Sequence, residues 1–350
     1  MFFDNLRKNI SGKFSREIGI DLGTANTLVY LKGKGIVVTE PSVVAVNTKT
    51  GQVVAVGRAA KDMLGRTPAH ITAVRPLVEG VVSDFEVTEE MLAYLIDKAQ
   101  GGKVAIGPRV VIGVPSGITN VETRAVIDAA KNAGAREVLI IEEPMAAAIG
   151  ARLPVEDPVG TMLIDIGGGT TDIALLSLGG VVRSKNLRVA GDALNADIAA
   201  YIRSEFKILV GEKSAEDVKL AVGSVLKPDI PLQTTVSGRD LVTGLPREIV
   251  ITDTDVREAI EQSVMSIVES IKEVLESAPP EITSDVMRYG IFVTGGGALL
   301  RGLTEYLSMH LKVAIHLIDD PLTTVVRGTG IVLEDIERYR PMLIDDAETF

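Results

Sequence analysis

Short apolar runs and longer segments of helical periodicity alternate along this 350-residue chain, a pattern typical of α/β proteins. Continuous apolar runs such as 110–112 predict strands that are buried on both faces of a sheet. The predicted strands cover 17–31 (strand, turn, strand), 110–114, 137–141, 162–164, 173–176, 181–189 and 291–294. The predicted helices cover 91–99, 120–132, 145–149, 192–206, a segment from 214, one from 252 or 254 to 277, one from about 301, and 322 to about 336. Two short apolar runs, 43–46 and 53–56, which flank a turn at 50–51, and alternating stretches at 230–237 and 247–252 predict further, shorter strands.

Residues at two helix starts predict how those helices are capped. Ser214, with Asp217 three positions on, forms an imperfect capping box. Thr252 or Thr254 is expected to cap the next helix, and the Pro-Pro pair at 279–280 should end it.

The segment 161–172, TMLIDIGGGTTD, contains the clearest candidate for binding chemistry. Its apolar strand delivers Asp165 to a run of three glycines, 167–169. Glycine adopts backbone conformations closed to other residues, so the triplet suits a tight turn whose N–H groups converge on phosphate. The Asp165 carboxylate would repel phosphate directly, which suggests a cation such as Mg²⁺ between them. Alone, this motif could equally be an ordinary turn.

A second copy of the motif favours the phosphate-binding interpretation. Residues 21–27, DLGTANT, align with residues 165–171, DIGGGTT, and both copies continue into apolar strands. The two copies are about one domain length apart. We therefore expect two similar domains, each offering one hairpin to the phosphates of a single nucleotide.

A third glycine-rich turn, 295–297, follows the predicted strand 291–294 directly and precedes a helix. A strand, a Gly-rich turn and a helix together can present a ligand to the helix N-terminus. The alternative is a packing turn, but beside two phosphate hairpins we expect a nucleotide contact.

Composition excludes several classes of function. The chain has no cysteine, which excludes disulfides, thiol nucleophiles and cysteine zinc sites, and its three histidines lack metal-ligand spacing. The P-loop pattern GxxxxGK[ST] is absent, so a nucleotide would be bound by a different motif. The net charge of −11 argues against nucleic-acid binding.

Hydrophobic residues make up 46% of the chain, but no stretch approaches the ~20 apolar residues of a membrane span. Asp4, Arg7 and Lys8 interrupt any secretory signal, so we expect a cytoplasmic location. Residues 1–16 form a basic amphipathic segment, which predicts binding to anionic lipid surfaces; a disordered leader or a helix on the protein's own surface are alternatives. Its apolar side chains at helical spacing are Phe2, Phe3, Leu6, Ile10 and Phe14. A loop at 101–108 is expected to expose Val104 and Ile106.

Seven segments spread over nearly the whole chain are distinctive: DLGTANTLVY (21–30), KGKGIVVTEPSVVAV (32–46), MLGRTP (63–68), VRPLVEGVVSDFEV (74–87), EEPMAAAIG (142–150), IDIGGGTTDIALLSLG (164–179) and VTGGGALLRGL (293–303). Together they resemble the MreB/Mbl family of bacterial actins, in the actin-like ATPase superfamily. The resemblance implies an α/β, actin-like (ribonuclease H-like) fold with two domains around an ATP cleft. The implied domains are 17–150 plus 320–350, with a small subdomain at about 32–75, and 151–319, with a small subdomain at about 190–250.

The resemblance also implies roles for individual residues. Asp21 and Asp165 would position Mg²⁺ through water. Glu143 would face the γ-phosphate opposite Thr170 and orient the attacking water; capping of the following helix is the alternative for Glu143. Val104 and Ile106 would add a second membrane contact. The nucleotide would be bound by Thr24, Ala25, Asn26, Gly167, Gly168, Gly169, Glu216, Asp217, Val218, Lys219, Gly296, Gly297, Ala298 and Leu299.

The leading hypothesis is a cytoskeletal protein whose ATP-dependent filaments lie on the inner face of the cytoplasmic membrane. Such filaments would maintain rod shape by organising the cell-wall elongation machinery and peptidoglycan synthesis, with ATP hydrolysis coupled to assembly. A small-molecule kinase of the same superfamily is the alternative, although it needs a catalytic base aimed at a substrate hydroxyl and no sugar-kinase motif is visible. A DnaK-type chaperone is not expected, because it would need a separate peptide-binding domain after residue 350.

Overall fold

The computed structural model describes residues 16–102 and 106–344 and divides into two compact units. The first unit comprises the described residues up to Asp157, with 178–180 and those from Thr323 onward; the second comprises 158–177 and 181–322. No helix among the described residues is long and apolar enough to cross a membrane.

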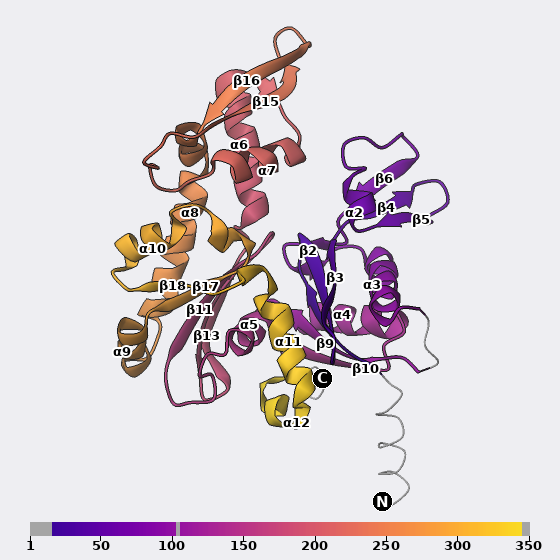
Figure 1. The fold of residues 1–350 in the computed structure, drawn as a ribbon, viewed down its shortest axis with the longest axis vertical. Coiled ribbons are helices and arrows are strands. Elements are labelled where there is room, and N and C mark those ends of the chain that lie inside the picture. Colours follow the sequence, from indigo (N-terminus) through magenta and orange to yellow (C-terminus); the bar gives the residue numbers. More distant parts are fainter. Residues whose placement is uncertain (1–15, 103–105, 345–350) are drawn as a thin grey trace, which may run out of the picture. The chain divides into compact units, whose positions relative to one another are not determined.

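The first unit is built on a five-stranded sheet in the order β10-β9-β1-β2-β3 (Figure 1). β1 pairs antiparallel with β2 and parallel with β9, and β9 pairs parallel with β10. The carboxyl ends of three parallel strands therefore meet at one edge. The strands are β1 (Glu17–Leu22), β2 (Asn26–Leu31), β3 (Gly35–Pro41), β9 (Arg109–Val114) and β10 (Glu137–Glu142).

The second unit repeats this arrangement, with a five-stranded sheet in the order β18-β17-β11-β12-β13. Its central strand β11 pairs antiparallel with β12 and parallel with β17, as β1 does with β2 and β9. The strands are β11 (Thr161–Ile166), β12 (Thr171–Ser177), β13 (Gly180–Leu187), β17 (Ile291–Thr294) and β18 (Ile315–Leu317). The expected duplication of a strand–hairpin–strand motif is thus a duplication of a whole sheet, and the predicted α/β class is confirmed.

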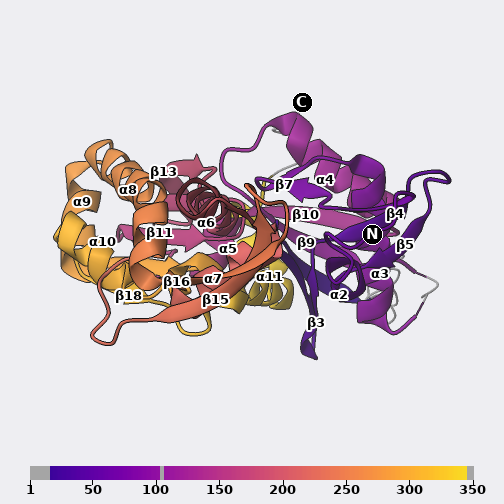
Figure 2. The ribbon, with the colours of Figure 1, turned by 90° about the horizontal axis from the view of Figure 1, so that it is seen from above.

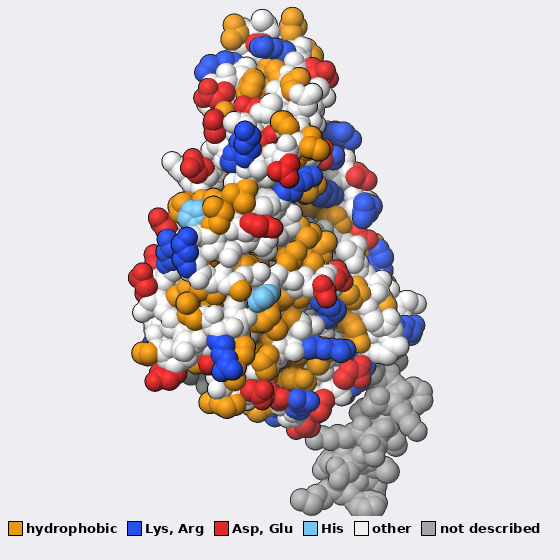
Figure 3. All heavy atoms as spheres, turned by 60° about the vertical axis from the view of Figure 1, so that its left-hand side comes forward, with side chains coloured by type: hydrophobic (Ala, Val, Ile, Leu, Met, Phe, Trp, Pro, Cys, Tyr) orange, Lys and Arg blue, Asp and Glu red, His pale blue; other side chains and the backbone are white. Residues whose placement is uncertain are grey.

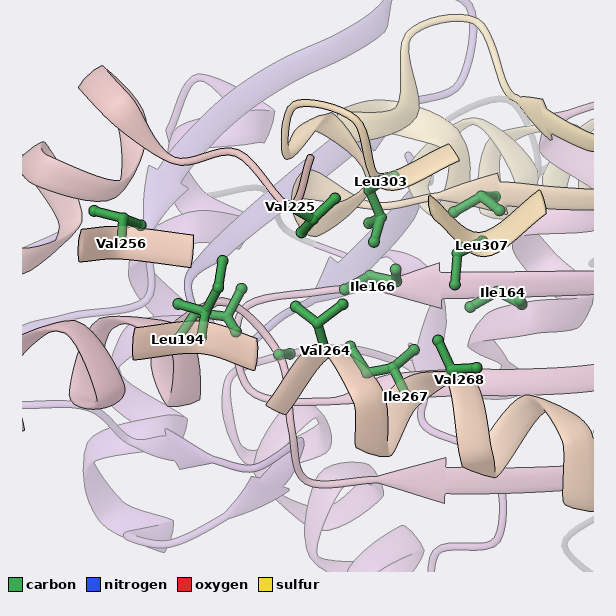
Figure 4. Close-up of a cluster of buried hydrophobic side chains, with 14 of the residues drawn as sticks. Ile164, Ile166, Leu194, Val225, Val256, Val264, Ile267, Val268, Leu303 and Leu307 are labelled. Atoms are coloured by element: carbon green, nitrogen blue, oxygen red, sulfur yellow. The ribbon is translucent and has the colours of Figure 1, made fainter. Parts of the chain in front are cut away.

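Helices cover each sheet within its own unit. The first unit has α3 (Phe85–Gln100), α4 (Asn120–Asn132), α5 (Glu143–Gly150), α11 (Thr324–Glu334), α12 (Ile336–Tyr339) and the 3₁₀ turn η3 (Arg340–Met342). The second has α6 (Gly191–Phe206), α7 (Glu212–Val222), α8 (Asp253–Glu276), α9 (Pro280–Tyr289), α10 (Leu303–Leu311) and the 3₁₀ turns η1 (Gly296–Leu299) and η2 (Pro321–Thr323). Figure 4 shows apolar side chains of β11, α8 and α10 meeting in the core of the second unit.

Two glycines let the backbones of α5 and α11 touch. A Cβ at Gly328 would lie 1.8 Å from the carbonyl oxygen of Ala146, and one at Gly150 would lie 2.0 Å from that of Thr324. No side chain fits at either point, so these helices pack backbone against backbone. α11 thus packs on α5 and on strands β1, β2 and β9 of the first unit.

Each unit also carries a smaller sheet. In the first, β4 (Val44–Asn47), β5 (Val53–Val56) and β6 (Ile71–Val74) form a three-stranded sheet beside the short α2 (Arg58–Lys61). A two-stranded hairpin, β7 (Leu77–Val78) and β8 (Val81–Val82), follows. In the second, α7 packs on the sheet of β14 (Ile208–Leu209), β15 (Gln233–Asp240) and β16 (Pro246–Thr252) (Figures 1 and 2).

Two sequence-based predictions are wrong in detail. α7 begins at Glu212 after Gly211 rather than at Ser214, and Asp217 pairs with Lys213 at 3.1 Å instead of completing a capping box. The third glycine triplet leads into η1 rather than directly into an α-helix, which starts only at Leu303. Thr252 does cap α8 as predicted, in a reciprocal capping box with Asp255.

Candidate functional site

In the first unit, the candidate acidic residues lie at the carboxyl ends of the three parallel strands. Asp21 of β1 pairs in register with Gly113 of β9. A Cβ at Gly113 would lie 3.4 Å from Cγ of Glu143, so the Glu143 side chain passes directly over this glycine. Asp21 and Glu143 are thus brought to the same edge of the sheet, which is where α/β proteins bind ligands.

The pKa of the Asp21 carboxyl is raised, and a nearby cation would lower it again. Burial raises the pKa of Asp21 to about 7, because the charged form has lost its water. A bound cation would favour the carboxylate. Among the described residues no group of three or more acidic or histidine side chains is placed to hold a metal ion.

The two glutamates at the start of α5 have different surroundings. Glu143 is buried beside Gly113. Burial raises the pKa of Glu142, and the neighbouring backbone of Gly117 and side chain of Ser116 oppose the rise. Glu142 makes no side-chain cap hydrogen bond to α5.

The first hairpin is held by buried hydrogen bonds. Its Thr24 Oγ1 accepts from the backbone N–H of Gly80, 3.0 Å away in the β7–β8 turn. The carbonyl of Ala25 accepts from the N–H of Ser42, and Asn26 is exposed. Gly23 is required for space, since a Cβ there would lie 2.7 Å from the carbonyl oxygen of Asn26.

The second hairpin follows Asp165, which is buried at the end of β11 opposite Asp172. The N–H of Gly167 donates to the carbonyl of Thr170 and closes the turn. Thr170 is buried, and Asp172 accepts two hydrogen bonds of 3.0 Å from the amide of Asn186.

The N-terminus of α6 lies against this hairpin. The N–H of Asp192 donates to the carbonyl of Gly168, and Lys219 Nζ donates to the carbonyl of Gly191 at 2.7 Å. A Cβ at Gly191 would lie 3.3 Å from that ammonium and 3.6 Å from Cα of Gly168. A helix N-terminus and a lysine beside a Gly-rich turn form a positive environment suited to phosphate.

The other residues predicted on α7 separate into different environments. Glu216 is half-buried, Asp217 is on the exposed face with Lys213, and the side chain of Val218 is in the core. Among residues 216–219, Lys219 is therefore the residue whose side chain lies beside the second hairpin.

The third glycine triplet packs directly behind Asp165. Gly295 has a φ of +85°, and a Cβ there would lie 2.3 Å from Oδ1 of Asp165. A Cβ at Gly297 would lie 2.3 Å from Cγ2 of Ile166. Gly296 and Leu299 are exposed, whereas the Ala298 side chain is buried in the core, so only its backbone can face a ligand.

Two residues that sequence reasoning missed support these elements. Ser42 holds the first hairpin. Arg301 donates to the carbonyls of Leu220 and Gly223 at the end of α7, and so ties α7 to the segment after η1. Both lie in segments that carry the family resemblance, 32–46 and 293–303, but composition and spacing gave no signal for their role.

The predicted membrane residues are only partly covered by the structure. Phe2, Phe3, Leu6, Ile10 and Val104 lie outside the described residues, whereas Ile106 is described and exposed. On the face drawn in Figure 3, acidic, basic and apolar side chains are interspersed.

Comparison with known proteins identifies the family. The family model for MreB/Mbl protein matches residues 15–341. The chain belongs to the MreB/Mbl family. It is 47% identical to the cell shape-determining protein Mbl of Bacillus cereus over 325 residues, which is 93% of this chain and 98% of that protein.

Solved structures show the same fold. MreB 5 of Spiroplasma citri bound to AMPPNP superposes with a TM-score of 0.89 at 40% identity, covering 93% of this chain and 98% of that one. A MamK double helical filament gives a TM-score of 0.79 at 25% identity, covering 92% and 99%. The predicted actin-like fold is therefore confirmed.

Proposed function

We propose that this chain binds ATP with Mg²⁺ and assembles into cytoskeletal filaments that determine cell shape. The observation that carries this proposal is the duplicated sheet, in which each copy ends in an Asp–Gly hairpin held by buried hydrogen bonds. The AMPPNP-bound MreB 5 and the filament-forming MamK support nucleotide binding and self-assembly, respectively.

The proposed nucleotide site uses both hairpins. Backbone N–H groups of 24–26 and 167–169 bind the phosphates, and Lys219 with the α6 N-terminus adds positive potential at the second hairpin. Residues 216–219 and 296–299 bind the nucleoside. Asp21 and Asp165 hold Mg²⁺ through water, and the ion neutralises phosphate charge.

Glu143 is the proposed hydrolytic residue, and Thr170 of the second hairpin is the other proposed catalytic residue. Its buried carboxylate beside Gly113 can accept hydrogen bonds from a water and orient that water for attack on the γ-phosphate. Hydrolysis would be coupled to filament assembly rather than to metabolism.

The proposed filaments lie on the inner face of the cytoplasmic membrane and organise the cell-wall elongation machinery and peptidoglycan synthesis in a rod-shaped cell. The basic amphipathic segment 1–16 and the exposed Ile106 support the membrane contact. A single segment binds lipid weakly, but a filament multiplies that contact.

The test combines polymerisation with membrane binding. Purified protein is mixed with Mg-ATP and anionic liposomes, pelleted, and viewed by electron microscopy, with ADP and neutral liposomes as controls. Membrane-bound filaments that need ATP are expected. Sugar-dependent release of ADP without polymer would instead indicate a small-molecule kinase.

A further inference from the structure

Ser42, which follows directly after β3, holds the first hairpin (residues 21–27) by hydrogen bonds, and we call this set of bonds its brace. Its backbone N–H donates to the carbonyl of Ala25 at 3.0 Å, and its Oγ donates to the carbonyl of Gly23 at 2.5 Å. The same Oγ lies 2.8 Å from Oγ1 of Thr27. Ser42 and Thr27 are both fully buried, so neither hydroxyl is available to a ligand in solvent.

The direction of these hydrogen bonds follows from the number of hydrogens. A serine hydroxyl has one hydrogen, and that of Ser42 is used for the carbonyl of Gly23. Thr27 must therefore donate to Ser42. The result is a buried chain, from Thr27 to Ser42 to Gly23, that joins both ends of the hairpin, and chained hydrogen bonds strengthen one another.

The second unit holds the equivalent groups in the same way but with different atoms. In the aligned hairpin, Gly167 corresponds to Gly23 and Thr171 to Thr27. Thr171 Oγ1 donates to the carbonyl of Val189 at 2.7 Å, and the carbonyl of Gly167 accepts from the N–H of Gly191 at 3.3 Å. Val189 and Gly191 follow β13, just as Ser42 follows β3.

We propose that Ser42 is the positioning residue of the first hairpin. It fixes the carbonyl of Gly23 and the hydroxyl of Thr27, and so sets the direction in which the backbone N–H groups of 24–26 point. The occurrence of an equivalent brace in the second unit indicates that holding these two groups is a requirement of the hairpin. The inference rests on the proposed nucleotide function, in which those N–H groups bind phosphate.

The test compares ligands with and without phosphates. Ser42→Ala leaves the Gly23 carbonyl and the Thr27 hydroxyl unpaired, and we expect affinity for ATP and ADP to fall about tenfold. Affinity for adenosine, which lacks phosphates, should stay within about twofold of wild type, and Ser42→Thr, which keeps the hydroxyl, should restore ATP affinity. Binding is measured by calorimetry per folded molecule, with thermal unfolding recorded on the same preparation.

Thr123→Val is the matched control. It removes another buried hydroxyl of the first unit, which, within the described part of the chain, donates to the carbonyl of Thr119, the N-cap of its own helix. This variant should lose stability and keep its ATP affinity. If Ser42→Ala lowers stability but keeps its affinity for ATP, as the control does, Ser42 has only a structural role. The same conclusion follows if the variant loses as much affinity for adenosine as for ATP. Wild-type protein that binds no ATP would reject the nucleotide function itself.

Discussion

Replacing Gly297 with alanine should destabilise the second unit, because the new methyl group has no space. Its Cβ would lie 2.3 Å from Cγ2 and 3.0 Å from Cβ of Ile166, which is buried and β-branched and so cannot rotate away. Overpacking of this kind costs about 1–3 kcal/mol. Alanine recovers about 0.5–1 kcal/mol over glycine in helical conformation, which leaves a net loss of up to about 2.5 kcal/mol.

Gly296→Ala is the matched control for this substitution. A Cβ there would meet only Cδ2 of the exposed Leu322, at 3.3 Å, and that side chain can move. The chain has no tryptophan, so unfolding in urea is followed by far-UV circular dichroism. Gly296→Ala, which has the same backbone gain without the clash, should be at least as stable as wild type, by up to about 1 kcal/mol.

A double-mutant cycle assigns the loss to one contact. Ile166→Ala removes Cγ2 and is itself destabilising, but in its background Gly297→Ala should cost at least about 1 kcal/mol less. Because Ile166 follows Asp165, the clash should also weaken ATP binding by displacing that carboxylate. Equal stability of the two glycine variants, or the absence of coupling to Ile166, would refute the steric reasoning.

Three further predictions concern other parts of the chain. Glu143→Ala should bind ATP and still polymerise but release phosphate far more slowly; a helix-capping role would instead lower the melting temperature and leave turnover per folded molecule unchanged. Deletion of residues 2–14 should weaken liposome co-flotation and leave polymerisation in solution intact, and full co-flotation of the truncated filaments would exclude that anchor. Backbone hydrogen bonds from Thr243 and Val242, with the nearby Arg247, lower the pKa of Asp240. Its stabilising contribution is therefore present above the unfolded-state pKa and lost as pH falls through the lower folded-state pKa, so Asp240→Asn should flatten the acid limb of a thermal-stability profile.

The sequence predicted those helices and turns whose determining residues lie within the element or directly beside it. The bounds of α4 follow from the reciprocal capping box of Thr119 and Glu122 at its start. The repeated Asp–Gly hairpins can be recognised in the sequence because the turn of each hairpin requires glycine. From these the sequence indicated the fold class and the candidate phosphate residues.

What it missed depends on contacts between distant segments. Ser42 supports the hairpin only because β3 returns beside it, and Arg301 reaches α7 across 78 positions. Such contacts between distant segments leave no pattern in a single sequence.

The predicted start of α7 is wrong for a local reason. Gly211, in extended backbone, precedes the helix and provides no capping side chain.

The two hairpins should differ in their tolerance of mutation. The brace of the first depends on a serine side chain, which a single codon change can remove. In the second hairpin, the Thr171 hydroxyl and the Gly167 carbonyl are held by main-chain groups after β13, the carbonyl of Val189 and the N–H of Gly191. Substitution of the side chain at 189 leaves these groups in place, whereas proline at 191 would remove the N–H. A saturation-mutagenesis screen should therefore find a narrow range of accepted residues at 42 and a broader one at 189, so that two similar hairpins in one chain would tolerate mutation unequally.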